Sequence, residues 1–464
     1  MKTLHISASY KPAYIYGGPI MSVAKLCEAL VRSKEQGLKS KEQGAELDRL
    51  KSLDSAQDDM MRRAESLRTK AENEKFKVES ERLKLEVLTT TANGKIELDV
   101  EVGQSIAVDG VHVKYFKRWT KDHSHFSPGL LWGLYRMLRQ AQHDNLIIHI
   151  HAWWNLVSVL SCLVAKWYNV PVVLSPRGML TGYTQNSRNS FPKRFLHLLI
   201  GKRLLSYSHI HATSEQEKLE VLKIVSPKSI TVIPNLVSVG QRAESGEQGT
   251  KNKEQGTKSE ELCEGESLET KAVSDVGSST FRLLFLSRIE QKKGLELLFE
   301  ALSTISLNYQ LTIAGSGHEK YVESLKAKVE SLKLSGQIDW LGQVNNEEKF
   351  SLLARHDLLV LPSYNENFAN VVIESLSVGT PVLVSENVGL AAYVKSNDFG
   401  WVCTLNSFDI KEKIATAYQN KLKRDFIRQE APNIILNDFN DEVLAERYME
   451  LYRNVLRLRS GGQP

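Results

Sequence analysis

Short apolar runs alternate with amphipathic stretches along most of this chain. In the first half, the runs that predict buried β-strands are Met1–Ala8, Leu85–Thr90, Val111–Phe116, Leu146–His151, Val170–Ser175, His209–Thr213 and Ile230–Pro234. Gly17 and Gly18 interrupt the chain, and Pro19 suits the first position of a helix. The apolar residues that follow repeat at helical spacing, and Leu156–Tyr168 predicts a further helix.

The same alternation restarts in the second half. The predicted strands there are Arg282–Ser287, Tyr309–Ala314, Ile338–Leu341, Leu358–Pro362 and Pro381–Ser385, and the predicted helices are Gly294–Ser303, Lys320–Leu334, Asn346–Ala354 and Val371–Val378. Strands that alternate with helices imply parallel sheets covered on both faces, so we expect two α/β lobes, Rossmann-like and doubly wound. Ligands of such sheets bind at the carboxyl ends of the strands, which makes the cleft between the lobes the expected site.

Two stretches depart from this pattern. In Ser33–Lys84, 25 of 52 residues are charged, and Gln241–Thr280 contains no aromatic residue and has a net charge of −4. Such segments bury too little apolar surface to offset the entropy of ordering, so we expect disorder or solvated helix. Surface insertions and partner-binding arms remain two alternatives for them. The resulting division is a first lobe at 1–236 with an insertion at 33–84, a linker insertion at 241–280, a second lobe at 281–437, and a last segment at 438–464.

Composition narrows the classes of protein. The chain has 464 residues and a formal net charge of +5, which is too small an excess to indicate nucleic acid binding. Its four cysteines form no CxxC pair, so neither a disulfide framework nor a structural zinc site is expected. The start of the chain does not resemble a signal peptide, and no apolar run is long enough to cross a bilayer. We therefore expect a cytoplasmic protein.

Basic and apolar residues are mixed in two segments that could contact a membrane. Phe191–Leu205 combines four basic residues with an apolar stripe, and Phe126–Arg139 is rich in aromatic residues and arginine. A helix of this kind can lie on anionic lipid, while an ordinary amphipathic core helix is the alternative. Peripheral contact with the cytoplasmic membrane face is a further expectation.

Charged residues and glycines follow the predicted strands of the second lobe. Arg288 and Lys293 are five residues apart in one loop between a strand and a helix, where they could converge on a diphosphate that the helix N-terminus also attracts. A solvated basic turn is the alternative for this loop. Gly315 and Gly317 follow the next strand and would let a ligand approach the backbone.

A third segment carries two carboxylates. Glu366 lies in the loop after a strand, and Glu374 lies eight residues later on the next helix. A sugar hydroxyl needs acceptors such as carboxylates, and the amides of Asn365–Asn370 can donate to a phosphate. The position of this segment between two buried strands makes it the most informative part of the sequence.

These motifs resemble those of glycosyltransferase family 4, the retaining nucleotide-sugar transferases with a GT-B fold. ENFANVVIE followed by SLSVGTPVLVS resembles the Glu-x7-Glu element of the family, and LFLSRIEQKKGLELLFEAL its phosphate-binding Arg/Lys motif. LTIAGSG resembles its glycine loop, and VIPN the end of its first lobe. HIHAWWN and SPRGML are similar to acceptor-side segments of members that build surface polysaccharides. The resemblance covers essentially all residues outside the two insertions.

The resemblance implies roles for individual residues. Arg288 and Lys293 would hold the donor diphosphate, Glu374 the nucleotide ribose, and Glu366 the transferred sugar. Donor binding would also involve Gly17, Gly18, Gly315, Gly317, Val344 and the amides of Phe368, Ala369 and Asn370. Ser287 and Ala369 stand where glycine is usual, and Arg177 stands where many relatives carry a histidine that touches the donor sugar.

The strand Leu146–His151 carries two histidines. We expect His149 and His151 to alternate, so that only His151, at the end of the strand, faces the cleft as a catalytic residue together with Arg177. His-x-His is also a spacing found in metal sites, but no carboxylate or cysteine is close in sequence. No Asp-x-Asp metal motif is evident, so we expect neither a metal nor a cofactor apart from the nucleotide sugar.

The sequence therefore predicts a retaining, metal-independent glycosyltransferase that moves a sugar from a nucleotide-diphosphate donor to a glycan or lipid-linked glycan acceptor. An inactive nucleotide-sugar-binding scaffold is the alternative, and a nicotinamide oxidoreductase is disfavoured because the glycine fingerprint is incomplete. The end of the chain, Asp438–Leu458, has apolar residues at helical spacing. The family resemblance implies that this helix crosses back onto the first lobe.

Overall fold

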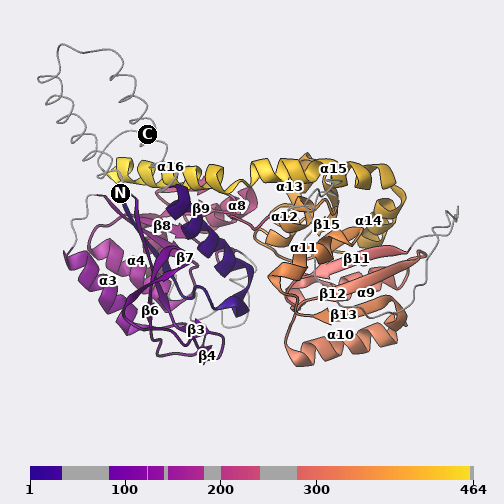
Figure 1. Ribbon diagram of the computed structural model, residues 1–464, viewed down its shortest axis with the longest axis horizontal. Coiled ribbons are helices and arrows are strands. Elements are labelled where there is room, and N and C mark those ends of the chain that lie inside the picture. Colours follow the sequence, from indigo (N-terminus) through magenta and orange to yellow (C-terminus); the bar gives the residue numbers. More distant parts are fainter. Residues whose placement is uncertain (34–82, 123, 141–144, 182–199, 241–279, 460–464) are drawn as a thin grey trace, which may run out of the picture.

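The computed structural model describes residues 1–33, 83–122, 124–140, 145–181, 200–240 and 280–459. Nearly all of Ser33–Lys84 and of Gln241–Thr280, and most of Phe191–Leu205, lie outside the described residues, so the expectations for these segments stay predictions. Figure 1 shows two lobes side by side, joined by a pair of helices that runs along both of them.

The first lobe contains an eight-stranded sheet in the order β10-β9-β8-β7-β1-β2-β6-β5. Its strands are β1 (Lys2–Ser7), β2 (Lys84–Thr90), β5 (Ser105–Val108), β6 (Val111–Phe116), β7 (Leu146–His151), β8 (Val172–Ser175), β9 (His209–Ala212) and β10 (Ser229–Val232). All neighbours are parallel except β5 and β6, which are antiparallel. Its helices are residues 18–33, α3 (Pro128–Gln140), α4 (Leu156–Trp167), α7 (Lys202–Tyr207) and α8 (Glu215–Ile224).

The two faces of this sheet bury alternate residues of each strand. Ile148 and Ile150 of β7 pack into the cluster that contains residues of α3, α4 and α7. Ile147 of the same strand packs into the other cluster, with residues of the helix at 18–33 and of the last helix, α16 (Asp441–Arg459). Helices thus cover both faces of the sheet, as a largely parallel sheet requires.

The second lobe contains a parallel six-stranded sheet in the order β13-β12-β11-β14-β15-β16. The strands are β11 (Phe281–Leu286), β12 (Tyr309–Ala314), β13 (Ile338–Gly342), β14 (Leu358–Leu361), β15 (Val382–Ser385) and β16 (Gly400–Cys403). The helices are α9 (Leu295–Leu302), α10 (Glu319–Ser331), α11 (Asn346–Ala354), α12 (Asn370–Ser377), α13 (Ala391–Ser396), α14 (Ser407–Gln419) and α15 (Lys421–Asp438). One continuous apolar cluster fills this lobe.

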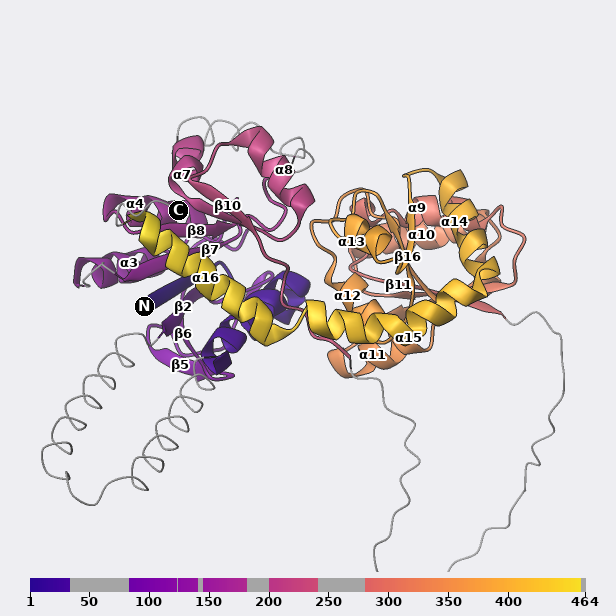
Figure 2. The same ribbon diagram turned by 90° about the horizontal axis from the view of Figure 1, so that it is seen from above.

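The chain passes between the lobes at two places that lie next to each other. At the first, Leu236 is buried in the core of the first lobe and Val237 in that of the second. At the second, α15 on the second lobe ends and α16 on the first lobe begins, as Figure 2 shows from above. Val239 and Phe439, from the two crossings, line one small cavity of about 280 Å³.

The first crossing lies before the 241–280 stretch and not within it. Gly240 already contacts the second lobe, because its amide donates to the hydroxyl of Ser377 at 2.9 Å. At the other end of the stretch, the hydroxyl of Thr280 accepts from the side chain of Asn308 at 3.1 Å. Both flanks of the stretch therefore contact the second lobe, and the connection between the lobes lies just before it, at Leu236 and Val237.

The last helix differs from the expected Asp438–Leu458 at its start. Asp438 is the final residue of α15, and α16 begins at Asp441. The side chain of Asn440 accepts from the amides of Glu442 and Val443 at 2.9 and 3.1 Å, which caps α16 and separates the two helices. α16 packs on the first lobe through its buried residues Leu444, Ala445, Tyr448, Leu451, Tyr452 and Val455.

Among the described residues, no helix combines the length and the apolar character that crossing a membrane requires. Cys27, Cys162 and Cys403 are buried free thiols, and Cys263 lies outside the described residues.

Candidate active site

A cleft of about 590 Å³ lies between the two lobes. The first lobe lines it with Tyr14, Ile15 and Gly17, and the second lobe lines it with the carboxyl ends of β11, β12 and β13 and the loops that follow. Five predicted donor-binding positions are among the lining residues: Gly17, Arg288, Gly315, Gly317 and Val344. The structure thus brings together residues that are more than 300 positions apart in the sequence.

Arg288 follows β11 and reaches the cleft from a partly exposed position. Its Nη1 donates to the carboxylate of Glu290 at 2.7 Å, and both side chains are between a third and a half exposed. An exposed ion pair of this kind contributes little to stability. An anionic ligand in the cleft can therefore compete with Glu290 for the guanidinium.

The neighbouring backbone leaves no room for a side chain at Gly315 and Gly317, which also line the cleft. Gly315 has a φ of 144°, and a Cβ on it would lie 1.8 Å from the carbonyl oxygen of Ser287. A Cβ on Gly317 would lie 2.3 Å from the carbonyl oxygen of Ile289. These glycines let the loops after β11 and β12 approach each other, a reason that the sequence-based prediction of ligand approach did not include.

Lys293 and Glu366, both predicted to contact the donor, form an ion pair with each other. Both side chains are largely buried. Burial lowers the pKa of Lys293 despite the nearby carboxylate. Burial is the largest single influence on the pKa of Glu366 and would raise it, but the charges of Lys293, Lys292 and Arg288 together with the hydrogen bond from Lys293 outweigh burial, and the pKa lies below its usual value. The pair thus fixes the loop of Glu366 beside the loop that follows β11.

Glu374, the predicted ribose ligand, also has a cationic partner. Its carboxylate accepts from the amine of Lys349 on α11 at 2.8 Å, and both side chains are mostly buried. Neither Glu374 nor the Lys293–Glu366 pair is among the described residues that line the 590 Å³ cleft. Donor contacts by these groups stay a prediction.

The segment Phe368–Asn370 forms the start of α12 beside the first lobe. Phe368 is buried, and its ring packs edge-on against Phe439 at 6.2 Å between centroids. Ala369 has a φ of 68° and a ψ of 73°, a left-handed conformation that favours glycine. This conformation accounts for the glycine that is usual at this position in the family that the sequence resembles.

Asn370 lies where the lobes meet. Its Nδ2 donates to the hydroxyl of Ser22 at 2.9 Å, and its Oδ1 accepts from Asn235 at 3.2 Å. A Cβ on Gly18 would lie 3.4 Å from the same amide nitrogen, so Gly18 contacts the second lobe and is not among the residues that line the cleft. Arg177 is joined to this group of hydrogen bonds, since its Nη1 donates to Oδ1 of Asn235 at 2.9 Å.

Arg177 is an unusual residue in this setting. Its φ is 51°, and burial lowers the pKa of its guanidinium. Its Nε is buried and makes no hydrogen bond. The guanidinium contacts Asn235, which contacts Asn370 of the second lobe, and Arg177 is not among the described residues that line the cleft. Its predicted catalytic role therefore stays a hypothesis.

The expectation that His149 and His151 alternate across the sheet was wrong. Side chains of a strand repeat every two residues, so both lie on one face of β7, with 4.2 Å between their ring centroids. Nδ1 of His149 lies 2.8 Å from the hydroxyl of Tyr452, and its Nε2 lies 2.7 Å from that of Ser175. Nε2 of His151 lies 3.0 Å from Nδ1 of His5, and its own Nδ1 is buried without a partner.

His5, His149 and His151 also offer ring nitrogens that lie within 4.8 Å of one another, a spacing that a metal ion could use. Burial, followed by the charge of Arg177, lowers the pKa of His5 to about 3, so this imidazole is neutral. However, both nitrogens of His149 already have hydroxyl partners, and the set contains no carboxylate to offset the charge of Arg177. These observations favour a buried hydrogen-bond network over a metal centre.

Two kinds of residue at this site were not predicted from the sequence. Tyr14 and Ile15 line the cleft, but no motif marks them; their signal was the run Tyr14–Tyr16 directly before the glycine pair. Asn367 joins the lobes, since its Nδ2 donates to Thr213 at 2.6 Å and to Glu217 at 3.2 Å. The carboxylate of Glu217 is buried and also accepts from the amide of Gly178 at 2.7 Å.

Comparisons with known proteins agree with this arrangement. Residues 268–433 match the family model of the glycosyl transferases group 1, and residues 80–241 match that of Glycosyltransferase Family 4. Together the two ranges take in well over half of the chain.

Among curated proteins, an uncharacterized glycosyltransferase of Methanocaldococcus jannaschii is 29% identical over 180 residues, which are 38% of this chain and 45% of that protein. The N,N'-diacetylbacillosaminyl-diphospho-undecaprenol alpha-1,3-N-acetylgalactosaminyltransferase of Campylobacter jejuni is 27% identical over 177 residues, again 38% and 45% of the two chains. The chain therefore spans less than half the length of these relatives.

Solved structures show the same fold at low identity. The structure of HepE from Anabaena in complex with UDP and glucose has a TM-score of 0.61 and 16% identity, and covers 98% of this chain and 100% of that chain. The structure of WaaG, a glycosyltransferase involved in lipopolysaccharide biosynthesis, has a TM-score of 0.57 and 13% identity, with 99% and 100% covered. Two lobes, two parallel sheets, the cleft at their strand ends and the two family matches agree, and the chain belongs to the group 1 and family 4 glycosyltransferases of GT-B fold.

Proposed function

We propose that the protein transfers a sugar, with retention of configuration, from a nucleoside-diphosphate sugar to a glycan or lipid-linked glycan. The observation that carries the proposal is the cleft of about 590 Å³, in which Arg288 and the glycine loop of the second lobe face Gly17 of the first lobe. A diphosphate requires cationic groups and close access to backbone amides, and this cleft offers both.

In the proposed reaction, the bond between the anomeric carbon and the diphosphate oxygen breaks, and its electron pair stays on that oxygen. The acceptor hydroxyl forms a bond to the anomeric carbon from the same face, and its proton passes to the leaving diphosphate. Arg288 would stabilise the developing negative charge. Lys293, which forms an ion pair with Glu366, would add positive charge. Two cationic side chains replace a metal ion in this scheme, and no cofactor is required.

The proposed acceptor class draws on the relatives. The name of the Campylobacter jejuni relative describes transfer onto a diphospho-undecaprenol-linked sugar, and that of LpsE from Rhizobium meliloti describes lipopolysaccharide core biosynthesis. LpsE is 21% identical over 278 residues, which are 54% of this chain and 80% of that protein. We accordingly place this enzyme in cell-surface polysaccharide synthesis, on the cytoplasmic face of the membrane.

One end of the first lobe supports the proposed membrane contact. α3, α4 and α7 contain no Asp or Glu, whereas they carry Arg136, Arg139, Lys166, Lys202 and Arg203. The tryptophan side chains of α3 and α4, Trp132 and Trp167, are 61% and 85% exposed. Aromatic residues interspersed with cations suit the interface of an anionic bilayer.

The test of the donor is a panel of nucleotide sugars, measured first by thermal stabilisation and then by transfer or donor hydrolysis. A true donor at about 100 times its Kd adds about 2.7 kcal/mol of stability. Arg288→Ala should then lower turnover more than tenfold, as expected for a lost electrostatic contact at the leaving group. Arg282→Ala is the matched control, because Arg282 lies at the other end of β11 and is similarly half-exposed.

Three results would count against the proposal. Near-normal turnover in Arg288→Ala would refute the assignment of that residue. Loss of activity on chelation of divalent ions would refute metal independence. Binding of nucleotide sugars without any transfer or hydrolysis would instead favour the alternative, an inactive nucleotide-sugar-binding scaffold.

The membrane contact is tested separately by sedimentation with vesicles of phosphatidylglycerol and phosphatidylcholine. The wild-type protein should bind vesicles that contain the anionic lipid, and replacing both Trp132 and Trp167 by alanine should weaken this binding. Phe408→Ala is a suitable control, because Phe408 is 71% exposed on the second lobe. Equal binding by all three proteins would exclude this end of the lobe as the contact.

A further inference from the structure

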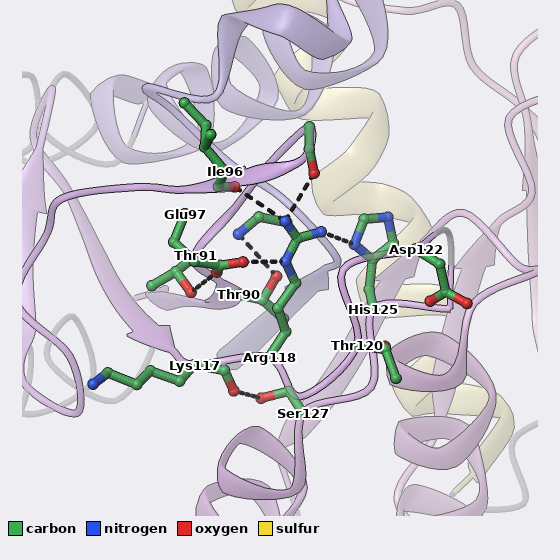
Figure 3. Close-up of polar contacts among 12 residues, drawn as sticks. Thr90, Thr91, Ile96, Glu97, Lys117, Arg118, Thr120, Asp122, His125 and Ser127 are labelled. Atoms are coloured by element: carbon green, nitrogen blue, oxygen red, sulfur yellow. Dashed lines mark hydrogen bonds and ion pairs between the residues drawn. The ribbon is translucent and has the colours of Figure 1, made fainter.

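The side chain of Arg118, in the first lobe, is fully buried. Figure 3 shows its guanidinium between Glu97, Ile96 and His125. Its Nε donates to the carboxylate of Glu97 at 2.7 Å, its Nη2 donates to the carbonyls of Gly94 and Ile96 at 2.8 and 3.0 Å, and its Nη1 lies 3.4 Å from Nδ1 of His125. One side chain thus holds a hairpin and a loop together.

The hairpin consists of β3 (Ala92–Asn93) and β4 (Ile96–Glu97). Gly94 lies in the turn of this hairpin and has a φ of 66°, which glycine adopts without strain. The second carboxylate oxygen of Glu97 accepts from the hydroxyl of Thr91 at 2.5 Å, so the carboxylate is held on both sides. Arg118 therefore fixes the position of the turn through its carbonyls and through Glu97.

This hairpin supports the short helix η1 (Tyr14–Tyr16). The amide of Gly94 donates to the hydroxyl of Tyr16 at 2.9 Å, and a methyl group of Ile15 would lie 3.1 Å from a Cβ on Gly94. On its other side, the ring of Tyr16 packs edge-on against that of His125, with 6.1 Å between centroids. Both groups that hold Tyr16 are themselves in contact with Arg118.

η1 is also the part of the first lobe that faces the cleft. Tyr14 and Ile15 line the cleft and are 53% and 62% exposed, and Gly17 follows directly with its amide donating to the carbonyl of Tyr14 at 2.9 Å. A displacement of Tyr16 would therefore move the whole first-lobe wall relative to Arg288.

We infer that Arg118 is a positioning residue for donor binding, acting through Tyr16 on a wall formed by Tyr14, Ile15 and Gly17. This inference rests on the proposed function, because it takes the cleft as the nucleotide-sugar site. The wall lines the cleft together with Arg288, so we expect its displacement to weaken donor binding more than it slows the chemical step. A purely structural arginine would change stability and leave the affinity for the nucleotide unaltered.

The inference is tested with Tyr16→Phe, which removes the hydroxyl that accepts from Gly94 and leaves the ring. The probes are UDP, GDP and ADP, with Kd measured by calorimetry and KM and kcat measured with the corresponding nucleotide sugar. We expect Tyr16→Phe to weaken binding of the preferred diphosphate and to raise KM by about five- to tenfold, as for one lost hydrogen bond. The kcat should stay within about twofold.

Tyr207→Phe is the matched control, because the hydroxyl of Tyr207 donates to one backbone carbonyl, that of Val170 at 2.8 Å, at the far end of the lobe. It should leave Kd and KM unchanged. Arg118→Lys keeps the charge but not the planar fork of donors, and it should show a larger effect of the same kind. If that variant does not fold, Tyr16→Phe alone decides the question.

The outcomes separate the two proposals. Wild-type binding of a diphosphate together with unchanged Kd and KM in Tyr16→Phe would overturn the inference and leave the proposed function standing. A fall in thermal stability without a change in Kd would mean that the cluster is only structural. Wild-type protein that binds none of the three diphosphates would overturn the proposed donor class and this inference with it.

Discussion

Acidification should destabilise the first lobe through its buried histidines. His5 and His211 are fully buried, and burial as the main cause lowers the pKa of each to about 3. In the unfolded chain a histidine has a pKa near 6.5. Between these two values the unfolded chain binds more protons than the folded protein, so stability is complete above pH 6.5 and falls as the pH drops towards 3.

The size of the effect follows from the two pKa values. At pH 5 each of these histidines lowers the free energy of unfolding by about 2 kcal/mol, because it is protonated in the unfolded chain and neutral in the folded protein. His5 and His211 together therefore cost about 4 kcal/mol relative to neutral pH. His149 and His151 act in the same direction, since burial also holds their pKa well below the usual value. This loss is comparable with the whole stability of many domains.

The assay is urea unfolding at pH 7, 6 and 5, followed by tryptophan fluorescence. His211→Gln should reduce the pH dependence by about one proton, or about 1.4 kcal/mol per pH unit. His112→Gln is the control for the substitution itself, because His112 is exposed on β6 of the same lobe. A free energy of unfolding that stays constant from pH 7 to pH 5 would show that the cluster is protonated or solvated in the folded protein, contrary to this reasoning.

Three further predictions concern single features. Ala369→Gly should raise the free energy of unfolding by up to about 1 kcal/mol, since glycine relieves the left-handed strain, and a lower melting temperature would contradict this. Gly315→Ala should cost about 3 kcal/mol in chemical denaturation because its Cβ would overlap the carbonyl of Ser287, and a wild-type midpoint would argue against that contact. Truncation before Asp438 should abolish sugar transfer while calorimetry still detects some nucleotide binding; unchanged turnover would rule out a functional role for the last helix.

Much of the fold could be predicted from the sequence, because buried parallel strands are continuous apolar runs. LIIHIH and FRLLFL, for example, became β7 and β11 with ends shifted by one residue at most. β5 was missed because it has only four residues, is half-exposed and lies antiparallel at the sheet edge, so its apolar run is too short to distinguish a strand. α15 was missed because it is highly charged and contains Pro432, which normally argues against a helix.

The candidate site could be predicted in part. Arg288 and the glycines of the second-lobe loops lie at strand ends, and the order of strands and helices is enough to place them at one edge. The ion pairs of Lys293 with Glu366 and of Lys349 with Glu374 join loops and helices whose packing the sequence does not reveal. Arg118 had no motif at all, because two of its four partners are backbone carbonyls of a hairpin and the other two are single side chains of that hairpin and of a loop.

The two adjacent crossings between the lobes have a mechanical consequence. The amine of Lys25 donates to the carbonyl of Val237 at 2.6 Å and lies 3.0 Å from the carboxylate of Asp441, so one side chain ties the two crossings together. Because the two connections lie next to each other, they restrict a rotation of the lobes about the line through them less than other movements. Such a rotation must also overcome the hydrogen bonds that Asn367 and Asn370 make across the lobes. Both flanks of the 241–280 stretch, Gly240 and Thr280, contact the second lobe, so the length of the stretch can change without altering the connections between the lobes.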